Sequence, residues 1–319
     1  MNTSVIWHNG TLKPWHEATV HVSAHALHYG SSVFEGMRVY ATPDGPQFFR
    51  LRDHTRRLFA SARMYGIDVG HDAAGIDAAC HAVVAANGMA SAYVRPLVFR
   101  GAGGLGVLAD DKAPVDVVVL ALPWGNYHGD AREQGADVCV SSWRRPAADT
   151  TPTWAKAGGH YLNSQLVAAE ARRHGYAEGI VLGVDGLLSE GAAENLFVVA
   201  DGALVTPPTS AGLLVGITRD SVMILARSLG LAVEERAMPR EALYAADEVF
   251  LCGTAAEITP VRSVDGMAVG AGGVGPVTKR LQDAFFGLFE GRTEDPWHWL
   301  TPVAATHDHT APEIEETAA

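Results

Sequence analysis

The sequence has little cysteine, little lysine and no long uninterrupted apolar run. Its 319 residues contain three cysteines, which are too few and too scattered for a disulfide framework or a cysteine-based zinc site. No apolar run approaches the roughly 18–20 uncharged residues that span a bilayer. The N-terminus lacks the basic start, long apolar core and small-residue cleavage site of a secretory signal. We therefore expect a cytoplasmic protein with no membrane partner.

Positive charge is also scarce. The chain has 24 lysines and arginines against 36 aspartates and glutamates, which gives a formal net charge of −12. This balance argues against nucleic acid as a partner, because such proteins normally carry a basic patch. Only four of the basic residues are lysines, so any lysine chemistry has few candidates: Lys13, Lys112, Lys156 and Lys279.

The remaining composition is ordinary for a globular protein, with 48% hydrophobic and 19% charged residues. The length suggests two domains. Hairpins interleaved with helices predict a mixed α/β (α+β) fold. We expect a smaller N-terminal α/β domain over 1–123, an interdomain loop over 124–136, a larger C-terminal domain over 137–300 and a disordered tail over 301–319.

Several local signals place individual elements. Asp53 is a good N-cap and predicts a helix that runs to Gly66, and a second helix is expected over roughly 72–87. Two Asp-Gly turns, at 185–186 and 201–202, predict an antiparallel meander. Further helices are expected near 162–174, after Gly216 and over the final amphipathic segment GPVTKRLQDAFFGLF.

Two motifs suggest chemistry but are weak. The glycines of GAGGLG (101–106) match a dinucleotide-binding pattern, which would indicate a NAD-dependent oxidoreductase, but the pattern must open a helix and Pro114 follows instead. His21, His25 and His28 have helical spacing but no nearby acidic or thiol partner, so we expect structural or surface histidines and no metal site.

Lys156 is the lysine best placed for chemistry. Its neighbours in TWAKAGGHY are small or aromatic, so a bulky group could approach its amine. Desolvation there would lower the pKa of the amine and make it nucleophilic enough for a Schiff base. The other three lysines lie beside a hairpin, in the DDKAP loop and on a helix face.

Three further segments gain weight when combined with Lys156. Glu194 precedes an apolar strand, where a buried carboxylate needs a partner. Ile217 and Thr218 open a helix, whose free N–H groups favour a phosphate. Thr254, in GTAAE, adds a hydroxyl and neighbouring amides suited to an anion. Taken singly, a strand-end glutamate, a helix cap and a turn explain these segments equally well or better.

Together these motifs resemble those of the class IV aminotransferases of PLP fold type IV, and among them the bacterial branched-chain amino acid aminotransferases. The resemblance extends from about residue 5 to Leu300. It rests on seven segments in order: HALHYGSSVFEGMRVY, AYVRPL, PWGNY, AKAGGHYLNS, SEGAAENLF, GITRD and GTAAEITPVRSVDG.

The resemblance implies a two-domain, pyridoxal 5'-phosphate-dependent transaminase that exchanges an amino group between a branched-chain L-amino acid and 2-oxoglutarate by a ping-pong route. It implies that Lys156 binds the cofactor covalently and moves the α-proton. Glu194 would lie beside the pyridine nitrogen and Tyr161 beside the phenolic oxygen. The phosphate would be bound by Arg57, Ile217, Thr218 and Thr254.

The resemblance also implies the substrate contacts and an oligomer. Tyr93 and the amides of Ala255 and Ala256 would bind the α-carboxylate, and Arg95 the distal carboxylate of glutamate. The side-chain pocket would be formed by Phe34, Gly36, Arg38, Trp124 and Tyr127. Tyr29 and the loop 105–107 would belong to a part of the site reached from a neighbouring subunit, so we expect at least a homodimer.

The sequence departs from the family pattern in the segments LLVGITRD and GVLADD and at three single residues. His160 stands where asparagine is common, Ala193 replaces a usual glycine, and Gly183 stands where an acidic residue is common. These departures leave the preferred donor open. A D-amino acid transaminase, an aminodeoxychorismate lyase-like enzyme and a specialised biosynthetic L-amino acid transaminase are the alternatives within this fold, and a catalytically idle binding protein is disfavoured.

Overall fold

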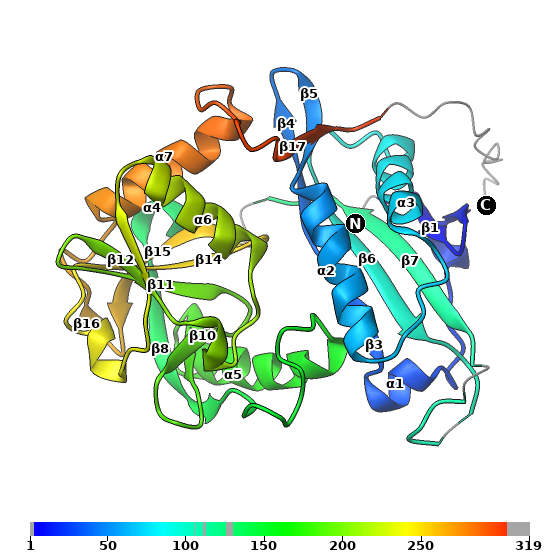
Figure 1. Ribbon diagram of the computed structural model, residues 1–319, viewed down its shortest axis with the longest axis horizontal. Coiled ribbons are helices and arrows are strands. Elements are labelled where there is room, and N and C mark those ends of the chain that lie inside the picture. Colours follow the sequence, from blue (N-terminus) through cyan, green and yellow to red (C-terminus); the bar gives the residue numbers. More distant parts are fainter. Residues whose placement is uncertain (1–2, 105, 111–112, 126–129, 305–319) are drawn as a thin grey trace, which may run out of the picture.

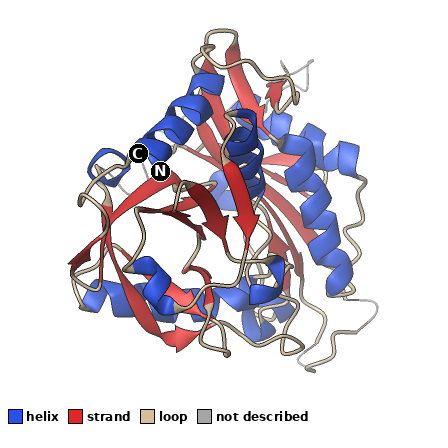
Figure 2. Ribbon diagram, turned by 60° about the vertical axis from the view of Figure 1, so that its left-hand side comes forward, coloured by secondary structure: helices blue, strands red, loops and turns tan. Residues whose placement is uncertain are grey.

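The computed structural model describes residues 3–104, 106–110, 113–125 and 130–304. Two large sheets, each with helices packed against it, make up most of the chain (Figure 1). Figure 2 shows strands and helices together in both halves of the molecule, as the predicted mixed α/β class requires. Among the described residues, no helix is long and apolar enough to cross a membrane.

The first sheet contains eight strands in antiparallel pairs. Its order is β17-β5-β4-β6-β7-β1-β2, with β3 also beside β6. The strands are β1 (Val5–His8), β2 (Thr11–Pro14), β3 (Ser32–Phe34), β4 (Met37–Thr42), β5 (Gly45–Phe49), β6 (Ala92–Arg100), β7 (Val115–Leu122) and β17 (Leu300–Pro302). The helices of this part are α1 (His25–Tyr29), α2 (Leu51–Met64) and α3 (Ala73–Ala86).

Helices α2 and α3 bury their apolar sides against this sheet. Helix α3 confirms the helix predicted over 72–87. The Asp72 carboxylate caps it by accepting the N–H of Gly75. The predicted N-cap of α2, Asp53, was wrong by three residues. Arg50, with φ of 56°, precedes the first turn, and Asp53 lies within that turn, where its carboxylate binds the Arg50 side chain.

The second sheet contains nine strands in the order β10-β9-β8-β15-β14-β11-β12-β13, with β16 also beside β15. The strands are β8 (Ala136–Arg144), β9 (Glu178–Leu182), β10 (Leu188–Gly191), β11 (Asn195–Ala200), β12 (Ala203–Thr206), β13 (Ala232–Glu235), β14 (Glu248–Gly253), β15 (Glu257–Val264) and β16 (Met267–Ala268). The helices are α4 (Ala131–Gln134), α5 (Tyr161–Arg173), α6 (Ile217–Ser228) and α7 (Pro276–Phe289). Four 3-10 turns complete the elements: η1 (Trp15–Glu17), η2 (Gly158–His160), η3 (Thr209–Ala211) and η4 (Arg240–Leu243).

The predicted meander is only partly correct. Both Asp-Gly turns do close antiparallel hairpins, β9 with β10 and β11 with β12. The two hairpins are not adjacent, because β8, β15 and β14 lie between them in the sheet. Strand β8 pairs in parallel with both β9 and β15, a long-range contact that turn signals do not reveal.

The tail begins later than predicted. Residues 300–302 form β17, which pairs with β5 of the first sheet, and the N–H of Val303 donates to Pro46. The apolar side chains of Trp299 and Leu300 pack in a core cluster and hold this segment in place. Residues 305–319 lie outside the described part of the chain. The two-domain boundaries stay a prediction.

The glycine segment 101–106 does not open a helix. It belongs to the connection between β6 and β7, whose described residues contain no helix. The dinucleotide-binding interpretation therefore lacks the structural context that it requires.

Candidate active site

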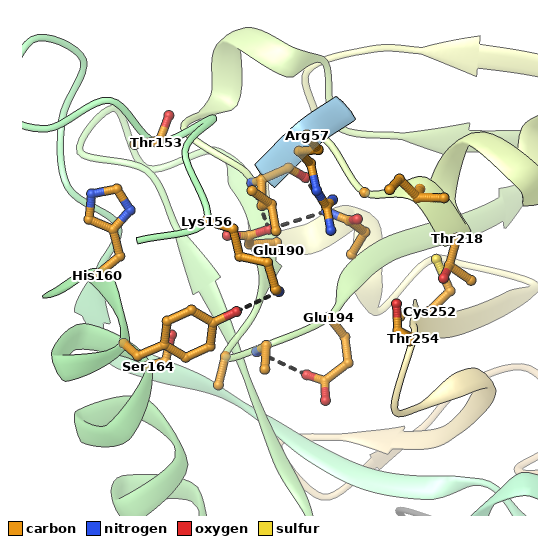
Figure 3. Close-up of a pocket in the computed structure, with 18 of the residues that line it drawn as sticks. Arg57, Thr153, Lys156, His160, Ser164, Glu190, Glu194, Thr218, Cys252 and Thr254 are labelled. Atoms are coloured by element: carbon orange, nitrogen blue, oxygen red, sulfur yellow. Dashed lines mark hydrogen bonds between the residues drawn. The ribbon is translucent and has the colours of Figure 1, made fainter. Parts of the chain in front are cut away.

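A cavity lies beside Lys156 (Figure 3). Its walls come from α2, from the segment around Lys156, from the β10–β11 connection, from the start of α6 and from the β14–β15 turn. All of the predicted catalytic and cofactor-binding residues line it: Lys156, Arg57, Tyr161, Glu194, Ile217, Thr218 and Thr254.

The backbone of Lys156 is fixed from the first sheet. Its carbonyl accepts the N–H of Phe34 at 3.0 Å, and its N–H donates to the Ser61 hydroxyl at 3.0 Å. The amine Nζ donates to the Tyr161 hydroxyl at 2.8 Å and lies 5.2 Å from the centre of the Phe34 ring. The amine therefore points into the cavity with a phenol beside it (Figure 3).

The predicted direction of the Lys156 pKa is wrong. Burial does lower the pKa of the amine, as expected, and the charge of Arg57 lowers it as well, but Tyr161, Glu35 and Tyr93 raise it, and the net pKa lies above its ordinary value. The amine is therefore protonated at neutral pH, and it must lose a proton before it can act as a nucleophile.

The other lysines fit the ordinary roles expected for them. Lys279 is exposed on α7 and pairs with Asp283, and Lys13 lies in β2. Lys112 lies outside the described residues.

An anion site faces the lysine at the start of α6. Gly216 precedes the helix without a side-chain cap, so the first N–H groups, including those of Ile217 and Thr218, are available. A Cβ at Gly216 would lie 1.9 Å from the Asn195 amide oxygen, so a side chain here would displace Asn195, whose amide donates to Glu190 and to the Leu214 carbonyl. Arg57 reaches the same place from α2 and donates through Nη1 to the Val215 carbonyl at 2.9 Å.

Glu194 lies buried in the cavity wall, as predicted, but beside another acid. Its Oε2 accepts the N–H of Ala193 at 3.1 Å, and its carboxylate is hydrogen-bonded to that of Glu178. Burial and the charge of Glu194 raise the pKa of Glu178 to about 9. Glu178 is therefore a neutral acid at pH 7 and donates its proton to Glu194.

A second buried carboxylate, Glu190, also lines the cavity. Its Oε1 lies 3.0 Å from Arg145 Nη2, and its Oε2 accepts the N–H of Leu214 at 3.0 Å and the Asn195 amide at 3.2 Å. Burial raises the pKa of Glu190, and the net direction is upward although Arg145 and Lys156 lower it. The carboxylate is thus fixed by three donors and is more basic than usual.

The predicted substrate residues form an aromatic cluster next to Lys156. The Phe34 and Tyr161 rings lie 5.0 Å apart, and Tyr93 stacks on Trp124 at 4.6 Å. The Arg95 guanidinium lies 4.8 Å from the centre of the Phe34 ring and donates to the Tyr93 hydroxyl at 3.1 Å. No carboxylate pairs with Arg95 in the part of the chain that the structure describes, which weighs against a purely structural ion pair.

The other predicted pocket residues are placed as follows. Gly36 lies against Tyr93, whose hydroxyl would be 1.8 Å from an added Cβ, so a side chain here would displace Tyr93. Arg38 is buried and lies 3.5 Å from Glu257. Ala255 and Ala256 form the β14–β15 turn together with Thr254. Tyr127 lies outside the described residues.

Sequence reasoning missed several buried partners of the site. Glu35 binds Arg57, His54 binds Glu35, and Arg145 binds Glu190. Both acids stand inside motifs that the sequence already singled out, FEG and SEG. A charged residue next to a glycine was the sequence signal that could have marked them. Their arginine and histidine partners lie 19 to 45 residues away, so the sequence did not reveal the pairs.

Two of the departures from the family pattern can be described from the structure: His160 makes a hydrogen bond, and Gly183 leaves room for a neighbouring side chain. His160 accepts or donates a hydrogen bond with the Tyr65 hydroxyl at 2.8 Å, and burial lowers its pKa. A Cβ at Gly183 would lie 2.6 Å from Asp185 Oδ1.

His25 forms hydrogen bonds with Ser31 and with the Gly106 carbonyl, and the described residues contain no cluster that could hold a metal ion.

Comparison with known proteins gives consistent results. The model of the class IV aminotransferase family matches residues 32–264. The chain is 56% identical over 299 residues to the branched-chain-amino-acid aminotransferase of Salmonella typhimurium, covering 93% of this chain and 97% of that one.

Solved structures agree with this. The crystal structure of the Escherichia coli branched-chain amino acid aminotransferase superposes with a TM-score of 0.94 at 55% identity, covering 95% of this chain and all of that one. The T.th. branched-chain amino acid aminotransferase complexed with N-(5'-phosphopyridoxyl)-L-glutamate superposes with a TM-score of 0.90 at 41% identity, again over 95% of this chain and all of that one.

Proposed function

The chain belongs to the class IV aminotransferase family, and we propose that it transfers an amino group between a branched-chain L-amino acid and 2-oxoglutarate with pyridoxal 5'-phosphate as cofactor. The observation that carries the proposal is the Lys156–Tyr161 pair facing an anion site within one cavity. The names of the relatives support the choice of branched-chain substrates. The T.th. complex supports both a pyridoxyl cofactor and glutamate as the second substrate.

The residues present fit this cofactor. An amine, a phenol, an arginine, an uncapped helix start and buried carboxylates surround a single cavity. Lys156 would bind the aldehyde carbon, Tyr161 the phenolic oxygen, and Arg57, Ile217, Thr218 and Thr254 the phosphate. When bound, the cofactor supplies an electron-withdrawing ring that stabilises negative charge on the α-carbon of the substrate.

Lys156 then acts as the base that takes the α-proton and returns it. The Tyr161 hydroxyl, 2.8 Å from Nζ, orients the amine and stabilises its charged form. A base works best when its geometry is fixed, and the two backbone hydrogen bonds of Lys156 to Phe34 and Ser61 provide this.

Two carboxylates compete for the place beside the pyridine nitrogen. The sequence motif points to Glu194, which lines the cavity and accepts a hydrogen bond from Glu178. Glu190 lines the cavity as well, but its oxygens already bind Arg145, Leu214 and Asn195, and the guanidinium of Arg145 balances its charge. We therefore propose Glu194 for this role, as the resemblance implies, and the two assignments differ in a measurable way.

The aromatic cluster accounts for two kinds of substrate. Phe34 and Trp124 offer an apolar surface to a branched side chain, and Arg95 offers a cation to the distal carboxylate of glutamate. Tyr93 and the amides of Ala255 and Ala256 would bind the α-carboxylate common to both. Arg38 and Tyr127 complete the proposed pocket.

The surface of the protein also supports the proposal of a homo-oligomer. Large apolar side chains on α1 and the nearby loop are exposed, and Val107 and Leu108 are 82% and 90% exposed. His25 ties that loop to α1 by hydrogen bonds to the Gly106 and Val107 carbonyls. Such an apolar group is typical of a protein interface. We propose that a neighbouring subunit covers it, at the edge that carries Tyr29.

A panel of amino donors with 2-oxoglutarate tests the proposal. Leucine, isoleucine and valine of L configuration should react faster than their D forms and faster than other L-amino acids, and the product should be L-glutamate. A preference for D-amino acids, or release of pyruvate from aminodeoxychorismate without transamination, would support an alternative within the same fold. Protein without a visible absorbance band after incubation with pyridoxal phosphate would contradict the cofactor.

A further inference from the structure

Glu35 is the fully buried carboxylate behind Arg57. It lies between β3 and β4, and its exposed fraction is 0%. Its Oε1 accepts the Nε–H of Arg57 at 2.6 Å and its Oε2 accepts an Nη2–H at 2.9 Å, so the pairing is bidentate. His54 Nδ1 lies 2.7 Å from the same Oε2. One side chain thus fixes an entire edge of the guanidinium.

The contacts of Arg57 decide which of its donors remain for a ligand. A guanidinium has five N–H groups. Glu35 uses the one on Nε and one on Nη2, and the Val215 carbonyl uses one on Nη1. This leaves one N–H on each terminal nitrogen, next to the start of α6. Two donors so placed match two oxygens of a phosphate group.

The charges of this cluster are well defined. Burial raises the pKa of Glu35. The charges and hydrogen bonds of Arg57 and His54 lower it by more than burial raises it, so the net pKa lies below its ordinary value. Burial lowers the pKa of His54 overall, although Glu35 opposes this. The charged Lys156 and the titratable hydroxyls of Tyr161 and Tyr93 face the cluster from the cavity side. At neutral pH the cluster therefore contains a carboxylate, a guanidinium and a neutral imidazole.

We propose that Glu35 is a positioning residue that holds Arg57 in the orientation that binds the phosphate group of the cofactor. The proposal rests on pyridoxal phosphate as the cofactor. Glu35 also neutralises part of the charge of Arg57, and this neutralisation by itself would weaken phosphate binding. The orientation that Glu35 gives to Arg57 outweighs this effect. Without Glu35, the buried guanidinium would have to turn toward another hydrogen-bond acceptor.

The test compares two ligands that differ only in the phosphate. Apoprotein is titrated with pyridoxal 5'-phosphate and with pyridoxal, and binding is followed by the visible absorbance of the bound aldehyde. For Glu35→Gln the dissociation constant of pyridoxal phosphate should rise roughly 10- to 100-fold, the scale for losing hydrogen bonds to a charged group. The dissociation constant of pyridoxal should not change, because Lys156 keeps its own contacts.

Glu248→Gln is the matched control. Glu248 is equally a buried glutamate, but it accepts the N–H groups of Val277 and Thr278 at the start of α7 and does not line the cavity. This variant should lose stability and keep the full preference for the phosphate form. A role of Glu35 in stability alone would make the two variants behave alike.

Glu35→Asp covers the case in which the glutamine variant does not fold. It keeps the charge but is one methylene shorter, so it cannot reach both nitrogens, and it should show a smaller loss that is again confined to pyridoxal phosphate. Equal losses for both ligands, or an unchanged or tighter binding of pyridoxal phosphate, would overturn the proposal. A wild-type protein that shows no preference for the phosphate form would instead contradict the cofactor assignment itself.

Discussion

Arg57 and Arg95, at the cofactor end and the substrate end of the proposed active site, have different surroundings. At the cofactor end the buried arginines have acid partners: Glu35 for Arg57 and Glu190 for Arg145. At the substrate end Arg38 is likewise paired, with Glu257, but Arg95 lies over aromatic rings and donates to a tyrosine. No carboxylate among the described residues pairs with Arg95.

The difference matches what each end must bind. A cofactor is the same molecule in every turnover, so fixed ion pairs that orient its ligands are an advantage. The substrate alternates between an apolar side chain and a carboxylate. A cation resting on aromatic faces tolerates the first and pairs with the second. Substitutions at the cofactor end should therefore affect all substrates alike, and substitutions at the substrate end should discriminate between them.

The largest effect is expected for Lys156→Ala. Loss of the base and of the covalent attachment should lower turnover at least ~10³-fold with every donor, since a positioned base alone contributes about 10²–10⁴-fold. Steady-state rates with L-leucine and L-glutamate would measure this. Lys279→Ala, which removes an exposed lysine paired with Asp283, is the control and should be fully active. Normal turnover by the Lys156 variant would remove this residue from the chemistry.

Arg95→Leu should separate the two substrates. Its half-reaction with L-glutamate should lose roughly 2–5 kcal/mol of transition-state stabilisation, the scale for removing one partner of a buried charge pair. Its half-reaction with L-leucine should change far less, because that side chain does not use the cation. Rapid-mixing absorbance measurements give both rates.

Arg100→Leu controls for the loss of an arginine from the same strand, since Arg100 donates to backbone carbonyls away from the pocket. Equal losses with both donors for Arg95→Leu would make Arg95 structural and the comparison wrong.

Glu190→Gln and Glu194→Gln form the next pair. The variant at the pyridine nitrogen should slow both half-reactions equally, by about 1.5–3 kcal/mol or one to two decades. From the sequence motif we expect this loss for Glu194→Gln, and a clearly smaller one for Glu190→Gln, because the oxygens of Glu190 already bind Arg145 and Leu214. The opposite order would assign the role to Glu190.

The smallest effect is expected on stability, from Glu178→Gln. The pKa of Glu178 rises from 4.5 to about 9 in the folded protein, so the native state binds a proton that the unfolded chain does not hold. Stability should therefore fall as the pH rises through the window between these two values. The glutamine still donates to Glu194 but does not titrate. The variant should gain roughly 1–3 kcal/mol over wild type at pH 8.

Denaturant unfolding of apoprotein at several pH values measures this gain. The difference between the two proteins should shrink toward pH 5, where free carboxyl groups are also protonated. Parallel stability curves would show that Glu178 is ionised in the native protein.

Groups that are close in the sequence were predictable, and groups brought together by the fold were not. Lys156 and Tyr161 lie in one short motif. Thr218 stands at a helix start and Thr254 in a turn, and the local segments GITRD and GTAAE mark both places. Glu35, in contrast, is recognisable as part of the site only when α2 packs beside β3 and brings Arg57 to it.

The fold shows the same division. The hairpins and the longer helices were predicted from local turns and caps, apart from the start of α2, where Arg50 in a left-handed conformation replaces an ordinary cap. The short helices α1 and α4 were not predicted, and α4 lies in the segment that was expected to be an interdomain loop. The pairing of β17 with β5 and the separation of the two Asp-Gly hairpins depend on contacts between residues far apart in the chain. The pKa of Lys156 likewise depends on residues far apart in the chain, because Glu35, between β3 and β4, and Tyr93, in β6, raise it.

The central claim is that one pocket receives both kinds of substrate, and competition between them tests it most directly. The wild-type protein loaded with pyridoxal phosphate is mixed with L-leucine and L-glutamate together, and the partition between the two oxo-acid products is measured. A single pocket predicts that each amino acid slows the reaction of the other, with an inhibition constant equal to its own half-saturation constant. Rates that simply add at saturating concentrations of both would show two separate sites and contradict the account.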